Sequence, residues 1–216
     1  MPVSSSRHPA ILRRVYTALA PVYDGLVPHV SGRARALGRR WLDVRDGERI
    51  LDVGTGPGRT LRALAAANPT GWTEGIDRTP AMVRRARRQL ASLPHRRHGV
   101  RQADATALPY PDDAFDALFS SYVVDVLPAP HMAAALREMH RVLRPNGRLV
   151  LVYMAPPHRP AGNLWAALAR ICPPLLGGDR PVALSSRLPA EGFTVQARAT
   201  RTQWGLHSGV LCAHPA

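Results

Sequence analysis

The sequence predicts a doubly wound α/β fold around an open, mainly parallel sheet. Three observations indicate this class. Short apolar segments alternate with amphipathic ones, a spaced-glycine loop follows the first apolar segment, and 216 residues suffice for one domain with a full core. With 45% hydrophobic and 20% charged residues, the chain is globular. Sheets of this kind bind ligands at the carboxyl ends of their strands.

The expected helices have apolar residues three or four positions apart, so each has one buried face. In the second helix Leu37 and Trp41 share a face, and in the fourth Thr79 is the expected N-cap before Pro80. An Asn-Pro pair at Asn68 ends the third helix. In chain order, the expected helices span residues 9–19, 33–44, 59–67, 80–90, 131–143 and 164–171.

The expected strands are short apolar runs between turn residues. The turn Arg144-Pro145-Asn146-Gly147 leads into the fifth of them, and two longer segments near the end of the chain are expected to close the sheet as a hairpin. In chain order, the expected strands span residues 50–53, 72–76, 100–103, 114–120 and 148–153, with the hairpin over 193–199 and 205–213.

Every one of the 29 basic residues is arginine, and the formal net charge is +14. This charge is typical of proteins that bind nucleic acid or an anionic membrane, but a GC-rich coding bias also replaces lysine by arginine, so both interpretations stay open. Without lysine, pyridoxal-phosphate enzymes, which form a lysine Schiff base, and P-loop NTPases are excluded. An arginine cluster near the fourth helix could hold the chain to an anionic membrane or form a solvated face. Its members are Arg84, Arg85, Arg87, Arg88, Arg96, Arg97 and Arg101.

The location we expect is cytoplasmic, with peripheral contact to an anionic membrane as an open alternative. The first ten residues contain no apolar signal segment, and the longest apolar stretch, residues 164–176, is interrupted by Arg170 and two prolines. Cys172 and Cys212 have no disulfide-like or metal-ligand spacing, which favours a reducing compartment, and we expect no metal site.

Glycine occupies every second position in the loop between the first strand and the third helix, at Gly54, Gly56 and Gly58. Glycines at such a turn let backbone N–H groups face a ligand. The dinucleotide fingerprint G-x-G-x-x-G does not fit, because G-T-G-P-G is one residue too short. Asp77 ends the second strand, where an acid reaches the ribose hydroxyls of a nucleoside, and Asp104 ends the third.

Five segments, in order, resemble the class I S-adenosylmethionine-dependent methyltransferases: "ILDVGTGPGRT", "GID", "ADATALPYPDDAFD", "ALFSSYVVDVLP" and "ALREMHRVLRPNGRLVLVYM". With the upstream "LAPVYDGL", they are most similar to the group of ubiquinone/menaquinone C-methyltransferases and bacterial phosphatidylethanolamine N-methyltransferases. The resemblance implies a seven-stranded Rossmann-like sheet over residues 46–216 and an N-terminal helical lid over residues 1–45.

The resemblance also implies a role for each site residue toward S-adenosylmethionine. The three glycines would face its methionine part, Asp52 would steady their loop, and Asp77 would hold the ribose. Ser121 would lie beside the sulfonium, and Tyr23 would close over the pocket from the N-terminal helices. Four residues would surround the adenine: Arg78, Met82, Asp104 and Ala105.

The acceptor that we expect is small or lipid-like: a phospholipid amine, a quinone precursor or another hydrophobic molecule. The candidate catalytic residues are Tyr23, Tyr122 and Asp125, since hydroxyl and carbon acceptors usually need a base. Two alternatives stay open. One is nucleic-acid methylation, which we do not expect because "SSYV" stands where an NPPY-like tetrapeptide would follow the fourth strand. The other is a non-catalytic cofactor-binding module.

Overall fold

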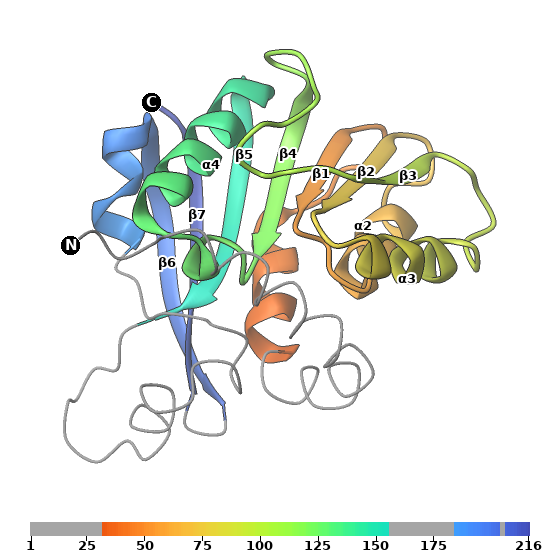
Figure 1. Ribbon diagram of the computed structural model, residues 1–216, viewed down its shortest axis with the longest axis horizontal. Helices are drawn as coiled ribbons and strands as arrows, with labels where there is room; N and C mark the ends of the chain where they lie inside the picture. Colours follow the sequence, from red (N-terminus) through yellow and green to blue (C-terminus); the bar gives the residue numbers. More distant parts are fainter. Residues whose placement is uncertain (1–31, 156–183, 204–205) are drawn as a thin grey trace, which may run out of the picture.

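The computed structural model describes residues 32–155, 184–203 and 206–216. These residues form one seven-stranded sheet in the order β3-β2-β1-β4-β5-β7-β6 (Figure 1). The pairs among the first five strands are parallel, while β7 runs antiparallel to both β5 and β6. The predicted mainly parallel, seven-stranded α/β fold is therefore confirmed.

The strands alternate with helices along the chain until the closing hairpin. The strands are β1 (Arg49–Val53), β2 (Trp72–Asp77), β3 (His98–Gln102), β4 (Phe115–Ser121), β5 (Leu143–Met154), β6 (Phe193–Gln203) and β7 (Leu206–Pro215). The helices are one over residues 32–42, α2 (Arg59–Ala66), α3 (Pro80–Leu90) and α4 (Ala129–Val142), with short 3-10 turns η1 (Val124–Val126), η3 (Leu184–Ser186) and η4 (Leu188–Glu191). Within the described ranges, no helix combines the length and the apolar character needed to cross a bilayer.

Helices cover both faces of the sheet because the central strands are apolar on both sides. On one face, Met139 of α4 packs in a cluster with Leu51 of β1 and Leu149 of β5. On the other face, Leu37 of the helix over residues 32–42 packs in a cluster with Val150 of β5. Neighbouring residues of one strand thus enter different cores, as the alternation of side chains along a strand requires.

Several boundaries differ from the predicted elements. β5 begins at Leu143 and not at Arg148, so the expected turn over residues 144–147 lies within this strand as an irregularity, where the pairing with β4 passes from Phe115–Leu143 to Ala117–Arg148. α4 begins at Ala129, two residues early, because a proline is tolerated in the first turn of a helix. Thr79 is the N-cap of α3, but its side chain makes no capping hydrogen bond; its backbone N–H instead donates to Asp77, 2.8 Å away. The expected helices over residues 9–19 and 164–171 lie outside the described residues.

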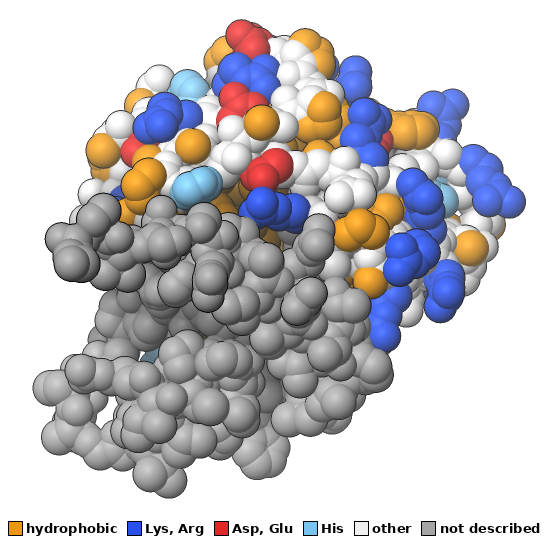
Figure 2. All heavy atoms as spheres, viewed as in Figure 1, with side chains coloured by type: hydrophobic (Ala, Val, Ile, Leu, Met, Phe, Trp, Pro, Cys, Tyr) orange, Lys and Arg blue, Asp and Glu red, His pale blue; other side chains and the backbone are white. Residues whose placement is uncertain are grey.

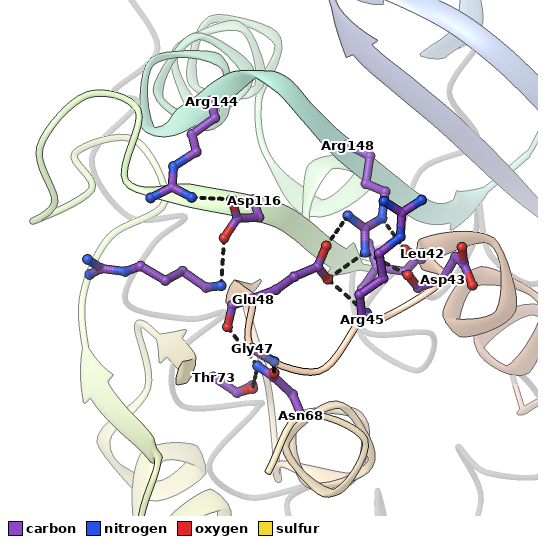
Figure 3. A network of polar contacts seen from close by, with 11 residues as sticks. Leu42, Asp43, Arg45, Gly47, Glu48, Asn68, Thr73, Asp116, Arg144 and Arg148 are labelled. Atoms are coloured by element: carbon purple, nitrogen blue, oxygen red, sulfur yellow. Dashed lines mark hydrogen bonds and ion pairs between the residues drawn. The ribbon is translucent and has the colours of Figure 1, made fainter. Parts of the chain in front are cut away.

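Arg148, at the amino end of the parallel part of β5, ties three segments together (Figure 3). Its guanidinium makes a bidentate ion pair with Glu48, with N–O distances of 2.8 and 2.7 Å. It also donates to the carbonyl oxygens of Leu42 and Asp43, where the helix over residues 32–42 ends. One largely buried side chain therefore donates hydrogen bonds to the carbonyl oxygens at the end of this helix and fixes the helix to the sheet.

We predict that Arg148→Gln lowers the free energy of unfolding by about 2–4 kcal/mol, since it leaves Glu48 and two carbonyl oxygens without their partner. Arg144→Gln, in the same strand, is the matched control, because Arg144 is exposed and makes one ion pair with Asp116. Its loss should cost less than about 1 kcal/mol. Urea unfolding of both variants measures the difference, and equal losses would contradict the anchoring role.

Candidate functional site

The glycine loop after β1 is shaped mainly by the protein's own packing. Gly54 and Gly58 have φ values of 71° and 92°, in the left-handed region that favours glycine. A Cβ on Gly54 would lie 2.1 Å from Val123, and one on Gly58 would lie 2.6 Å from the backbone of Ala86. A Cβ on Gly56 would meet no atom of the described residues within 4 Å. The loop is thus held from both sides, while none of the described residues comes close to its middle.

Asp77, the last residue of β2, holds the loop in place. One carboxylate oxygen accepts from the backbone N–H of Gly56 and the other from that of Thr79, both at 2.8 Å. Its backbone carbonyl accepts from the N–H of Ala103, just after β3. Burial raises the pKa of the Asp77 carboxyl, and the two backbone hydrogen bonds oppose that rise. Each carboxylate oxygen keeps a lone pair for a further donor, such as a ribose hydroxyl.

Asp52 lies beneath the same loop and is 1% exposed. Its carboxylate accepts a 2.7 Å hydrogen bond from the hydroxyl of Thr55, between two of the glycines. Burial raises the pKa of Asp52 to about 7, the Thr55 hydrogen bond and Arg35 act against the rise, and the charge of Asp77 adds to it. Two desolvated carboxyl groups therefore sit under the glycine loop, where a bound cation would favour their charged form.

The residues expected around the adenine lie after β2 and β3. Asp104 accepts two hydrogen bonds from Thr106, at 3.0 and 2.8 Å, and lies 3.6 Å from the guanidinium of Arg78. Ala105 is partly buried against the core that α4 covers. Met82 is 4% exposed, as its place in the apolar stripe of α3 predicts. The structure thus brings Asp104 and Arg78 together and places Met82 in the interior.

Ser121 ends β4 and Tyr122 follows it, next to the helix over residues 32–42. The guanidinium of Arg35 donates to the Ser121 hydroxyl at 3.3 Å and lies 5.0 Å from the centre of the Tyr122 ring. The Tyr122 hydroxyl lies 2.8 Å from that of Ser208 on β7. One face of the Tyr122 ring is therefore already covered by a cation. Tyr23 lies outside the described residues.

Asp125 is a fully buried acid in the η1 turn after β4. One carboxylate oxygen accepts a 2.7 Å hydrogen bond from the N–H of Met154, at the carboxyl end of β5, and the other has no hydrogen-bond partner within the described residues. Burial raises the pKa of Asp125 to about 6, against the opposing effects of its backbone hydrogen bonds and of Arg35. A buried carboxylate oxygen without a donor is costly, so this atom is available for a ligand.

Sequence reasoning missed Arg35, Thr55 and Ser208. Arg35 is one arginine among 29 and bears no motif, so its position over Ser121 follows only from how its helix packs. Ser208 reaches the site because β7 is inserted next to β5. Thr55 could have been found, because a hydroxyl three residues after a buried acid can donate back to it.

A parallel sheet with a glycine loop after β1 and acids after β2 and β3 defines an α/β protein that binds a nucleoside-containing cofactor. Residues 50–147 match the family described as a methyltransferase domain. The chain is 32% identical, over 208 residues, to the demethylmenaquinone methyltransferase of Thermus thermophilus, covering 84% of this chain and 92% of that protein. The chain belongs to the class I S-adenosylmethionine-dependent methyltransferases, as the sequence predicted.

Other relatives are matched over less of their length. The chain spans 48% of the malonyl-[acyl-carrier protein] O-methyltransferase of Halorhodospira halophila, at 35% identity over 67% of this chain. It spans 31% of a 37.1 kDa protein in transposon TN4556 of Streptomyces fradiae, at 43% identity over 51% of this chain.

Solved structures share the fold at low sequence identity. An S-adenosylmethionine-dependent methyltransferase from Aquifex aeolicus superposes with a TM-score of 0.67, at 19% identity over 95% of this chain and 98% of that one. The [4+2]-cyclase SpnF superposes with a TM-score of 0.76, at 21% identity over 100% of this chain and 98% of that one. Because one of these proteins is a cyclase, the fold alone does not fix the reaction.

We predict that Asp52→Asn changes how the stability of the cofactor-free protein depends on pH. A pKa raised to about 7 means that the folded protein keeps a proton that the unfolded chain has lost. The stability from Asp52 is thus fully present below about pH 4 and is lost as the pH rises to about 7. The wild type should lose at least about 1 kcal/mol relative to the asparagine variant across this range, measured by urea unfolding.

Asp46→Asn is a control in which the effect on stability should depend on pH in the opposite direction. Asp46 is an exposed acid whose pKa is lowered, chiefly by a hydrogen bond from the backbone of Thr70. Its stabilising effect is present above its ordinary pKa and is lost as the pH falls through the lowered value. If the wild type and Asp52→Asn differ by the same amount at every pH, Asp52 does not titrate in this range.

Proposed function

We propose that this methyltransferase acts on a small, lipid-like acceptor and binds S-adenosylmethionine at the glycine loop. The cofactor site is supported by Gly56, where a Cβ would meet none of the described residues within 4 Å. Asp77 accepts from the N–H of this glycine, and Asp52 lies beneath the loop. The cofactor is cationic, and desolvated carboxyl groups under the loop suit a cation. The residues present therefore fit the group that the family uses.

The chain's own residues would orient the cofactor. Asp77 would hold the ribose with the lone pairs that Gly56 and Thr79 leave free, and Asp104 with Arg78 would border the adenine. The N–H groups of Thr55, Gly56 and Gly58 already donate to Ile76, Asp77 and Thr55, so they are not proposed as donors to the methionine carboxylate. Ser121 would lie beside the sulfonium. When bound, the cofactor supplies an activated methyl group that leaves as a neutral thioether forms, so positioning supplies most of the rate.

A relative and two apolar segments of the sequence support the acceptor class. The Thermus thermophilus relative is named for demethylmenaquinone, and it matches the chain nearly end to end. The segments LVPHV and GNLWAAL are apolar. A quinone precursor is therefore the first acceptor to test, followed by phospholipid amines. A lid over residues 1–45 with Tyr23 above the site, a cytoplasmic location and peripheral membrane contact remain predictions.

Asp125 is the candidate general base favoured by the geometry. One of its carboxylate oxygens is buried beyond β4 without a hydrogen-bond partner among the described residues. Its pKa of about 6 would leave it charged and basic near neutral pH. Tyr122 is less suited, because its hydroxyl contacts Ser208 and its ring contacts Arg35. A carbon or hydroxyl acceptor would lose its proton to the free oxygen of Asp125 as the new bond to the methyl group forms.

We predict that Asp77→Ala weakens binding of S-adenosylmethionine at least tenfold, about 1.4 kcal/mol, by calorimetry. The variant removes the acceptor of Gly56 and Thr79 together with the proposed ribose contact. Asp46→Ala, before the amino end of the sheet, is the control and should bind normally. An unchanged affinity in Asp77→Ala would remove this residue from the cofactor site. If the wild type binds the cofactor but no acceptor is ever labelled, a non-catalytic module is the better explanation.

The acceptor is found by offering labelled cofactor with quinol precursors, extracted lipids and RNA. We predict labelling of a hydrophobic small molecule, and labelling of RNA alone would favour the nucleic-acid alternative.

With a carbon or hydroxyl acceptor, Asp125→Asn should lower kcat by about 10²–10⁴-fold with little change in cofactor affinity. The wild-type kcat should fall as the pH drops below about 6, where Asp125 gains its proton. An Asp125→Asn variant with normal kcat would exclude the base.

A further inference from the structure

Four arginines surround a cavity of about 680 Å³ beside the helix over residues 32–42. This arginine cavity has a volume within the range of small-molecule sites, about 300–1,000 Å³. Among the described residues, no acidic side chain lines it. Its lining consists of Arg33, Ala36, Arg39, Arg40 and Arg201. The cavity thus concentrates positive charge at one place on the protein.

One face of the helix supplies most of the lining. Arg33, Ala36, Arg39 and Arg40 are spaced three or four residues apart, so they share one side of the helix. Leu37, between them in sequence, is buried against the sheet. The arginine side is therefore the outward side of a helix whose inward side is fixed by core packing.

Strand β6 supplies the remaining arginine. Arg201 is the register partner of Ser208 on β7, and cross-strand partners project from the same face of a sheet. Ser208 is in contact with Tyr122, the residue that follows β4. Since Arg35 stacks on Tyr122 and lies one helical turn before Arg39, the arginine cavity is next to the candidate site.

Three arginines of the cavity, Arg39, Arg40 and Arg201, have no carboxylate partner among the described residues, unlike several other arginines. Arg148 pairs with Glu48, and Arg141 pairs with both Asp112 and Glu138.

Arg39 shows the electrostatic cost of this arrangement. Burial and the nearby charge of Arg35 lower the pKa of Arg39. Mutually repelling guanidinium groups around one cavity are stabilised by a bound anion.

We propose that the arginine cavity is a binding site for a phosphate group. A guanidinium group pairs bidentately with phosphate, and several guanidinium groups can bind the three free oxygens of one phosphate at once. A carboxylate offers only two oxygens and a single charge. Four arginines therefore match a phosphate better than a carboxylate. A soluble phosphorylated compound and a phospholipid headgroup share this chemistry. The site is separate from the glycine loop, and phosphate binding there does not depend on methyl transfer.

The test compares two variants that each lose three positive charges. The cavity variant, Arg39→Gln/Arg40→Gln/Arg201→Gln, loses three of the cavity's positive charges. The α3 variant, Arg84→Gln/Arg88→Gln/Arg97→Gln, loses three charges of the exposed arginines around α3 (Figure 2). Calorimetry with sodium pyrophosphate at 0.15 M salt, where charges beyond about 8 Å are screened, should show binding to the wild type and to the α3 variant. We expect at least tenfold weaker binding to the cavity variant. Thermal unfolding in phosphate-free buffer checks that both variants fold.

A second arm identifies the source of the phosphate. Sedimentation with phosphatidylglycerol–phosphatidylcholine vesicles that depends on the cavity arginines and is displaced by pyrophosphate would indicate a lipid headgroup. Pyrophosphate binding without sedimentation would indicate a soluble compound. Absence of both, or equal losses in the two triple variants, would overturn the proposal. If the cavity variant unfolds, the single variant Arg201→Gln, exposed on β6, decides the question by the same titration.

Discussion

The carboxylate of Asp77 fixes the arrangement on which the rest of the site depends. It joins the end of β2 to the loop after β1 and to the first turn of α3, through the N–H groups of Gly56 and Thr79. Without this acceptor, two partly buried N–H donors would lose their partner, and the loop would no longer be fixed to the end of β2. Gly54 and Gly58 complete the arrangement, because only residues without a side chain fit against Val123 and Ala86.

The charge of the site is opposite to the charge of the molecule. The chain carries a net +14, yet carboxyl groups gather at the carboxyl ends of the central strands. Asp52 and Asp125 are buried there, and Asp77 is partly buried. Burial raises the pKa of each. Such groups are costly in an empty protein and become favourable when a cation binds. The stability of the cofactor-free protein and its affinity for a cationic ligand are therefore linked.

Pattern and motif predicted most of the fold but only part of the site. Strands such as 50–53 were predictable because an apolar run, a glycine loop and an amphipathic helix all indicate the same topology. The acids after β2 and β3 were predictable from their place at strand ends. The contacts of Arg35 and Ser208 were not, because they arise between segments far apart in sequence. Whether Met82 is interior or exposed to a ligand also needed the packed structure.

The helix over residues 32–42 has an inward side and an outward side with different constraints on their residues. Its inward side is tightly constrained, since even a methyl group on Gly38 would lie 2.9 Å from Val152. Its outward side, around Arg39 and Arg40, contributes little to the core. Substitutions there are expected to leave the sheet and the glycine loop unchanged, so this surface can vary without loss of foldability. Selectivity for new ligands would therefore arise on one side of a single helix.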